Sequence, residues 1–305
     1  MKRATLIYNP VAGRNPSRRE RHIQHAGEIL QKSGLEVKLA RTAGPGSATE
    51  LARQAAAHGD EIILACGGDG TINEVINGMC PGHAALAILP GGTANIIAKE
   101  LRLPHHPVRA AREFHAWKPR RIALGRVTGD PIPQSAASDP VQRYFLSVAG
   151  VGFDAYVIHR LTFGFKMSLG VAAYILEGAR QWTRYSFPPV MCHVDGREQQ
   201  VTFAIVQRTS RYAGWFRTAP QQSIINSHFG VSLYTSSSRL RYVAYALGIL
   251  CQRRVRDIIE IETRNLSFTA VRPEPPVYFE VDGELAGTLP ARFEVVPDAL
   301  TLFMP

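Results

Sequence analysis

Cysteine is scarce in this sequence, and the few cysteines form no pattern. Cys66, Cys80, Cys192 and Cys251 are scattered through 305 residues, without a C-x-x-C pair and without histidines at metal-ligand spacing. Disulfide-rich domains and zinc modules carry their cysteines at short, regular spacings. We therefore expect buried thiols in a reducing cytosolic setting and no disulfide framework.

Long hydrophobic runs are also missing. The run ATLIY near the N-terminus is too short for the core of a signal peptide, and Asn9-Pro10 interrupts it. The longest uncharged apolar stretch elsewhere, Val243 to Cys251, is about half as long as a membrane-spanning helix needs. The sequence therefore predicts a cytoplasmic protein without a segment across a bilayer.

Acidic residues are outnumbered, since 25 of them face 35 lysines and arginines, for a formal charge of +10. Such an excess favours polyanions, which include nucleic acid, anionic lipid headgroups and phosphorylated substrates. A charge carried for solubility alone explains the excess equally well. No nucleic-acid-binding motif accompanies it, so we expect no nucleic-acid partner.

Several enzyme motifs are absent. The chain has no Walker A sequence and no G-x-S-x-G elbow, which argues against a P-loop enzyme and against a hydrolase. Gly150-x-Gly152-x-x-Ala155 formally fits a dinucleotide fingerprint, but we find no convincing helix start or βαβ unit after it. We therefore expect no nicotinamide site there.

The first hundred residues alternate between strand-like and helix-like segments. Strands are predicted at 4–10, 35–43, 61–66 and 85–90, with helices from Pro16 to about Lys32, from Ser47 to Gly59, and after Thr71 and Asn95. EIILAC at 61–66 is continuously apolar, as strands buried on both faces of a parallel sheet are. The alternation predicts a three-layer α/β nucleotide-binding domain over residues 1–122.

From about residue 120 the pattern changes to short strands separated by turn residues. Segments such as YFLSVAGV, TFAIVQ and VYFEVDG are typical of these strands, and helical regions near 166–183 and 239–252 interrupt them. The pattern predicts a mostly antiparallel β-sandwich domain over residues 123–305. Its last strand, about 296–305, can return to the first domain.

Two strand-to-helix junctions are rich in glycine. In the first, Gly67 and Gly68 let the backbone approach a ligand, and the following helix aims unpaired N–H groups at an anion. Asp69 lies in this turn, where a carboxylate beside phosphates requires a cation such as Mg²⁺ between them. The second junction, Gly91 to Asn95, repeats the layout at the same edge of the predicted sheet. Tight connections would explain one such turn, whereas two favour a nucleotide-phosphate site.

These junctions resemble the diacylglycerol kinase catalytic family, which includes sphingosine kinases and bacterial lipid kinases. The similar segments are GGDGT at 67–71, Asn9-Pro10 with Gly13, PGGTAN-x-x-A at 90–98, YFLSVAGVGFDA at 144–155, the stretch around Lys166, VDGEL at 281–285 and the terminal VVPDALTLFMP. The resemblance covers essentially the whole chain. GGDGT alone is shared with NAD kinases, but the second motif, the long β domain and the late DGE favour lipid kinases.

The resemblance implies roles for individual residues. Those implied to contact the nucleotide are Asn9, Thr42, Gly67, Gly68, Asp69, Gly70, Thr71, Ile72, Asn73 and Thr93. Asp69 would also be catalytic, through the Mg²⁺ bound to ATP, and Glu284 would be the general base or orienting group for the acceptor hydroxyl. A solvated glutamate beside a common D-G turn is the alternative for Glu284.

The second half departs from the family pattern. Many bacterial members resemble D-G-x-L-D before a late strand, where the first aspartate helps to bind a structural Mg²⁺. His228-Phe229-Gly230-Val231-Ser232 contains no carboxylate, so we expect that metal site to be missing or stabilised in another way. Thr209 and Ala213-Gly214-Trp215 stand where the family often has asparagine and paired glycines, so the lipid pocket differs too.

Together these features predict an ATP- and Mg²⁺-dependent kinase that acts on a hydroxyl of a membrane lipid such as diacylglycerol. An NAD kinase-like enzyme with a soluble acceptor and a non-catalytic lipid- or nucleotide-binding protein remain alternatives. Arginines such as Arg239 and Arg241 bracket the apolar run at 243–251, which suits transient docking on the anionic inner membrane face. A core helix with solvated arginine ends explains them as well. A homodimer is compatible with the sequence.

Overall fold

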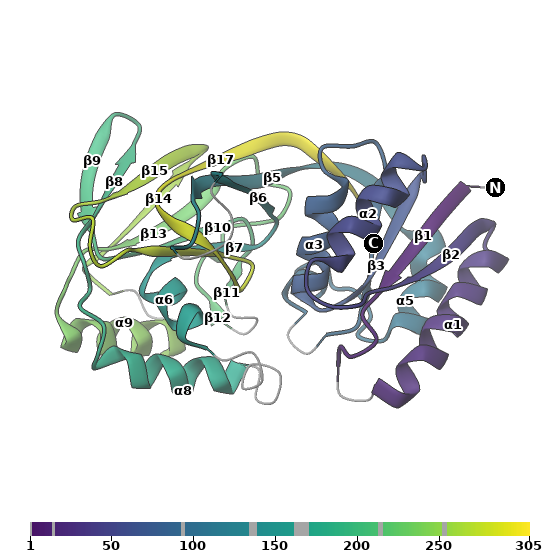
Figure 1. The fold of residues 1–305 in the computed structure, drawn as a ribbon, viewed down its shortest axis with the longest axis horizontal. Helices are drawn as coiled ribbons and strands as arrows, with labels where there is room; N and C mark the ends of the chain where they lie inside the picture. Colours follow the sequence, from purple (N-terminus) through teal and green to yellow (C-terminus); the bar gives the residue numbers. More distant parts are fainter. Residues whose placement is uncertain are drawn as a thin grey trace. The chain divides into compact units, whose positions relative to one another are not determined.

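The computed structural model describes residues 2–13, 16–92, 95–133, 139–161, 171–212, 216–251 and 255–305. They form two compact units, Met1–Leu124 with Pro297–Pro305, and Gly125–Val296 (Figure 1). The predicted fold class is confirmed: an α/β domain is followed by a β-rich sandwich domain. No helix among these described residues is long and apolar enough to cross a membrane.

The first unit is built on a parallel sheet with the order β4-β3-β1-β2. Its strands are β1 (Lys2–Tyr8), β2 (Leu35–Arg41), β3 (Ile62–Gly67) and β4 (Ala85–Pro90), and β17 (Glu284–Met304) pairs with β4 in parallel through Thr301 and Leu302. Its helices are α1 (Pro16–Lys32), α2 (Ser47–Ala57), α3 (Asp69–Met79), α4 (Ile96–Glu100) and α5 (Pro107–Glu113), followed by a 3₁₀ turn, Phe114–Ala116. Figure 1 shows α2 and α3 on one face of the sheet and α1 and α5 on the other.

The parallel register brings the carboxyl ends of four strands to one edge. Tyr8 at the end of β1 pairs with Arg41 and with Cys66, and Gly67 pairs with Pro90. Every residue of β3 and β4 is buried, as expected of strands that helices cover on both faces. The loops that leave these strands therefore share this edge, where open α/β sheets bind their ligands.

The second unit is a mostly antiparallel sheet system with three described helices. Its strands are β5 (Lys118–Asp130), β6 (Val141–Phe145), β7 (Val148–Gly152), β8 (Val190–Val194), β9 (Arg197–Val201), β10 (Phe203–Gln207), β11 (Arg211–Tyr212), β12 (Phe216–Arg217), β13 (Phe229–Tyr234), β14 (Ile258–Thr263), β15 (Asn265–Ala270) and β16 (Tyr278–Val281), with part of β17. The helices are α6 (Phe153–Arg160), α8 (Val171–Trp182) and α9 (Arg239–Cys251). Phenylalanines fill its core, among them Phe145, Phe229, Phe268, Phe279 and Phe293.

Two expectations are corrected. α6 begins directly after Gly152, so the inference that no helix starts there was wrong. The preceding strand, β7, nevertheless pairs antiparallel with β10 and β16, so the turn does not belong to a βαβ unit. Cys66 and Cys192 are buried as expected, but Cys80 is partly exposed and Cys251 exposed, and all four thiols are free.

Candidate active site

The two glycine-rich turns lie against each other at the carboxyl edge of the first sheet. Gly91 N–H donates to the Gly67 carbonyl oxygen at 3.0 Å. A Cβ placed on Gly92 would lie 2.4 Å from Gly68 Cα, and one on Gly67 would lie 2.4 Å from Thr71 Cβ. Since no side chain fits at these approaches, the glycines are required for the two backbones to meet.

Asp69 and Asn95 form hydrogen bonds that hold the two turns in place. Asn95 has a φ of 49°, and its side chain bonds both polar groups of Gly92, accepting from N–H at 3.0 Å and donating to the carbonyl oxygen at 2.8 Å. Asp69 Oδ1 accepts from Ile97 N–H at 3.4 Å, which links the first turn to the start of α4. Thr93, predicted to contact the nucleotide, lies outside the described residues.

The start of α3 is suited to an anion with a bound cation. Gly68, Asp69 and Gly70 are partly exposed, and Asp69 is the first residue of α3, where the helix dipole favours phosphate. Mg²⁺ in nucleotide complexes typically takes one or two protein carboxylates and completes its shell with phosphate oxygens and water. Asp69 fits that requirement. Among the described residues, no group of three or more His, Cys, Asp or Glu could hold a metal by itself.

Arg19 of α1 forms hydrogen bonds to the backbone at this edge of the sheet, and no sequence motif indicated it. Its side chain is only 7% exposed. The guanidinium donates to the carbonyl oxygens of Asn9 at 2.7 Å, of Gly91 at 2.7 Å and of Cys66 at 3.3 Å. Gly13, with a φ of 84°, leaves room for this network, because a Cβ there would lie 2.9 Å from the Gly91 oxygen. One cation therefore joins the ends of β1, β3 and β4.

Asn9 and Thr42, also predicted to contact the nucleotide, lie on the same edge. Asn9 N–H donates to the Cys66 carbonyl oxygen at 3.0 Å, and Thr42 N–H donates to the Tyr8 carbonyl oxygen at 3.0 Å. Thr42 is 8% exposed. The structure thus brings these two residues and the glycine-rich turns to one edge of one sheet.

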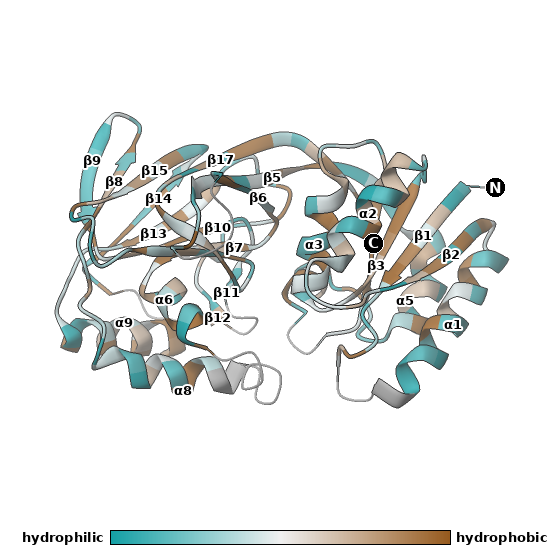
Figure 2. Cartoon of the chain, in the orientation of Figure 1, coloured by the Kyte–Doolittle hydropathy of each residue, from teal (hydrophilic) through white to brown (hydrophobic). Residues whose placement is uncertain are grey.

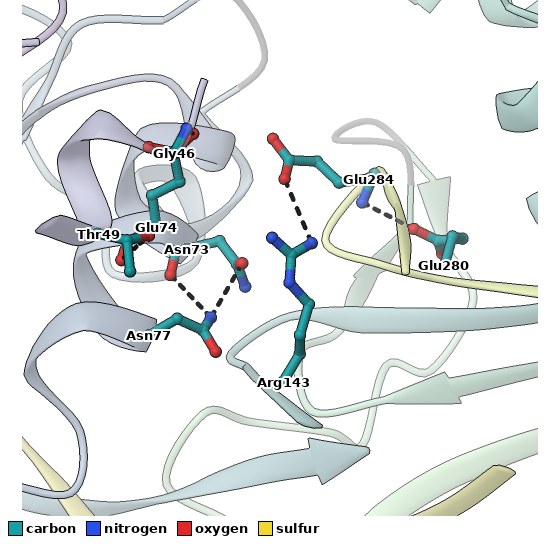
Figure 3. Close-up of polar contacts among 9 residues, drawn as sticks. Gly46, Thr49, Asn73, Glu74, Asn77, Arg143, Glu280 and Glu284 are labelled. Atoms are coloured by element: carbon teal, nitrogen blue, oxygen red, sulfur yellow. Dashed lines mark hydrogen bonds and ion pairs between the residues drawn. The ribbon is translucent and has the colours of Figure 1, made fainter. Parts of the chain in front are cut away.

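Ile72 and Asn73 lie in the interior instead. Both are fully buried, and Ile72 N–H already donates to the Gly68 carbonyl oxygen at 3.1 Å. Asn73 Oδ1 accepts from Asn77 Nδ2 at 3.1 Å (Figure 3). The next residue, Glu74, accepts from Gly46 N–H at 2.9 Å and so holds the start of α2. These contacts give Ile72 and Asn73 packing roles, and their contact with a nucleotide stays a prediction.

In the second unit, Glu284 follows a tight turn between β16 and β17. Asp282 has a φ of 50° and Gly283 a φ of 83°, the two positive values that a type I′ hairpin turn requires. The Asp282 carboxylate accepts from three consecutive backbone N–H groups, at 3.1, 2.9 and 3.0 Å, those of Leu146, Ser147 and Val148. This anchor fixes the turn against the start of β7.

The Glu284 carboxylate itself is directed by Arg143. The Arg143 guanidinium lies 3.6 Å from Glu284 Oε2, and the two side chains are 30% and 32% exposed (Figure 3). A partly exposed carboxylate held by one arginine can still receive a proton from a bound hydroxyl. Arg143 lies on β6, far from Glu284 in sequence, so no sequence motif signalled the pair.

A buried pair of carboxyl groups lies behind this turn. Glu280 is 1% exposed and accepts from Gly283 N–H at 2.8 Å. Burial raises the pKa of Asp154, and hydrogen bonds to Tyr174, Tyr212 and Glu280 oppose that rise. Two carboxyl groups can share a hydrogen bond only if one of them keeps a proton. The two carboxyl groups therefore share one proton.

The residues that depart from the family pattern have structural roles. Phe229 is fully buried in the apolar core, and Ser232 is 7% exposed. Thr209 is also fully buried, and its hydroxyl bonds that of Ser147 at 2.9 Å. The segment Ala213–Trp215 and Lys166 lie outside the described residues.

The loop before β13 does not fit a structural Mg²⁺ because an arginine already bonds three of its carbonyl oxygens. The fully buried Arg208 donates to the carbonyl oxygens of Asn226 at 2.6 Å, of Ile224 at 3.0 Å and of His228 at 3.5 Å. Burial lowers the pKa of Arg208 to about 10, so the side chain stays protonated at neutral pH. A cation of the chain itself thus bonds these carbonyl oxygens, and the expected loss of a structural Mg²⁺ site stays a prediction.

Comparisons with known proteins cover both units. A family model described as the diacylglycerol kinase catalytic domain matches residues 3–127, and one described as the YegS C-terminal NAD kinase beta sandwich-like domain matches residues 147–304. A curated diacylglycerol kinase of Bacillus subtilis (strain 168) is 29% identical over 313 residues, covering 100% of this chain and 97% of its own. One from Staphylococcus aureus (strain MRSA252) is 24% identical over 308 residues, covering 100% and 93%. The crystal structure of a diacylglycerol kinase from Bacillus anthracis str. Sterne superposes with a TM-score of 0.75 at 20% identity, covering 100% of this chain and 97% of that one.

Proposed function

The chain belongs to the diacylglycerol kinase family, and from that membership we propose that it transfers the γ-phosphoryl group of ATP to a hydroxyl of a membrane lipid. Membership establishes an ATP-dependent kinase. The membrane-lipid acceptor, with diacylglycerol as the leading candidate, is the part that we propose.

One observation carries the proposal: Glu284 is placed on a turn that the rest of the unit holds rigid. Three backbone N–H groups fix Asp282, Glu280 holds Gly283 N–H, and Arg143 directs the Glu284 carboxylate. A solvated glutamate in an ordinary hairpin would need none of these contacts. Rigid placement supports a role as general base, because proton transfer needs the base at hydrogen-bond distance from the hydroxyl.

In the first unit, the start of α3, the paired glycine turns and Asp69 would hold the phosphates and the Mg²⁺ of the nucleotide complex. In the second, Glu284 would take the proton from the acceptor hydroxyl as its oxygen bonds to the γ-phosphorus. The bond between that phosphorus and the β–γ bridging oxygen breaks, and ADP leaves.

The test is to incubate the purified protein with Mg²⁺, γ-labelled ATP and separate acceptors: diacylglycerol, phosphatidylglycerol, a sphingoid base and NAD. Glu284→Gln and Asp69→Asn accompany the parent. Glu294→Gln is the matched control, because Glu294 lies on the same strand, pairs with Arg126 at 2.7 Å and is 29% exposed. We expect labelled diacylglycerol, a loss of roughly 10²–10⁴-fold with Glu284→Gln, and near-parental activity in the control.

The other outcomes decide between the alternatives. Label in NAD alone would assign the chain to a soluble acceptor. ATP binding without label in any acceptor, and without an effect of Glu284→Gln, would support a non-catalytic binding protein.

A further inference from the structure

One side of α9 exposes large aliphatic side chains to solvent. They are Leu240, Val243, Leu247 and Leu250, which are 78%, 41%, 53% and 55% exposed. Their spacings of three, four and three residues place them on one face of the helix, while the opposite face is buried through Tyr242, Tyr245 and Gly248. An aliphatic stripe of this length is unfavourable in water and marks an interaction surface.

The neighbouring helix α8 buries polar side chains and exposes apolar ones. Glu177 and Gln181 are 7% and 4% exposed, whereas Ile175 and Leu176 are 55% and 58% exposed. Gln181 Nε2 donates to Glu177 Oε1 at 2.5 Å, so the two buried polar groups satisfy each other. A helix that meets only water on its outer side normally carries polar residues there. α8 is therefore built for a partner of low polarity.

The two helices lie side by side (Figures 1 and 2) and are bordered by positive charge. Trp182 Nε1, at the end of α8, donates to the Arg239 carbonyl oxygen at the start of α9 at 2.9 Å. The exposed bordering arginines are Arg180, Arg184, Arg239 and Arg241. Arg180 pairs with Glu177 at 3.8 Å and Arg241 with Asp257 at 3.1 Å, so Arg184 and Arg239 carry the charge that an anionic partner would meet. Within residues 171–184 and 239–251 the only acidic residue is Glu177, which is buried. No exposed carboxylate in either helix opposes an anionic partner.

We propose that the outer sides of α8 and α9 form a docking surface for an anionic lipid bilayer. Leucine side chains would enter the boundary between headgroups and acyl chains, and the arginines would remain at the lipid phosphates. A second copy of the chain would bring arginines toward arginines, whereas anionic headgroups neutralise them. The inference rests on the proposed function, because it names the surface through which the acceptor-binding unit reaches its lipid.

The test measures binding to vesicles without ATP, by co-sedimentation and light scattering. The vesicles are pure phosphatidylcholine or phosphatidylcholine with phosphatidylglycerol. For Leu240→Ser with Leu247→Ser and Leu250→Ser we expect about 1000-fold weaker binding, since each inserted leucine contributes roughly tenfold. Arg184→Gln with Arg239→Gln should weaken binding to anionic vesicles by about 30-fold and leave binding to phosphatidylcholine vesicles unchanged. Val271→Ser, a matched control at a residue that is 48% exposed, should bind as the parent does.

The readouts separate docking from catalysis. Label transfer to a short-chain diacylglycerol dispersed as monomers should be unchanged in the triple leucine variant, which also shows that it is folded. If the parent does not bind anionic vesicles, or if the triple variant binds them as tightly as the parent does, the docking surface is refuted even where kinase activity is present. If the parent is a dimer and the triple leucine variant is a monomer that still binds vesicles, the docking surface is refuted and the leucines form a contact between two copies of the chain. Vesicle binding that depends on the leucines, in a protein that labels no lipid, upholds docking and refutes only the proposed acceptor.

Discussion

Replacing Arg208 with methionine tests whether a cation of the chain itself holds the loop before β13. Methionine has a similar length and can fill the space, but it donates no hydrogen bond. The substitution leaves the carbonyl oxygens of Ile224, Asn226 and His228 without this donor inside the protein. Each buried group that loses its partner costs about 1–3 kcal/mol.

Methionine carries no charge that must be desolvated, which offsets part of that cost. Burial of the Arg208 charge is unfavourable, because it has lowered the pKa of Arg208 to about 10. We therefore expect Arg208→Met to lower the free energy of unfolding by about 3–5 kcal/mol. At roughly 2–4 °C per kcal/mol for a unit of this size, the melting temperature should fall by about 10 °C. Arg217→Met, at an exposed arginine of β12, should change the stability by less than about 0.5 kcal/mol.

The assay is urea denaturation followed by circular dichroism, with and without EDTA and with and without Mg²⁺, in the absence of nucleotide. We expect EDTA to leave the parent unchanged and Mg²⁺ to restore nothing to Arg208→Met. A loss of several kcal/mol in the parent on adding EDTA alone would show that a bound metal holds this loop. A free energy of unfolding of Arg208→Met within about 0.5 kcal/mol of the parent would show that Arg208 does not stabilise it.

Three further predictions concern Arg19, Asp282 and Asp154. Arg19→Gln removes the cation that joins three strand ends, so steady-state kinetics should show a KM for ATP raised about tenfold and an unchanged KM for the lipid. Asp282→Ala releases the turn that carries Glu284, so kcat should fall at least about tenfold with the KM for ATP unchanged. Because the folded-state pKa of Asp154 is raised from 3.8, the parent should lose stability as pH rises from about 4 toward that raised value. Asp154→Asn, which stays neutral, should remove this slope in thermal unfolding recorded across pH.

The α/β half of the fold could be predicted because its signals are local. Continuous apolar strands at β3 and β4, each ended by glycines, specify both the layer and the edge at which a ligand binds. The residues that resemble the kinase family lie in these same turns. In the second half, alternation in short segments gave the sheet class, but strand pairing between β6, β7, β16 and β17 depends on contacts that are distant in sequence.

The parts that could not be predicted are side chains that act on distant backbone. Arg143 directs Glu284 from another strand, and the Asp282 carboxylate bonds N–H groups more than a hundred residues away. In sequence, α9 is equally compatible with a core helix and with a surface helix. Only the burial of Tyr242 and Tyr245 on one face distinguishes the two.

Arg19 and Arg208 follow one physical principle in the two units. Each guanidinium bonds three backbone carbonyl oxygens at strand ends or in loops. A planar group with five donors can bond several carbonyl oxygens at once, and charged donors give stronger hydrogen bonds than neutral ones. A lysine ammonium concentrates the same charge on one nitrogen and cannot reproduce that planar arrangement of donors. We therefore expect lysine to restore the hydrogen bonds at neither site. At Arg19 the loss should appear as weaker ATP binding, because the carbonyl oxygens that Arg19 bonds belong to the edge that carries the phosphate-binding turns.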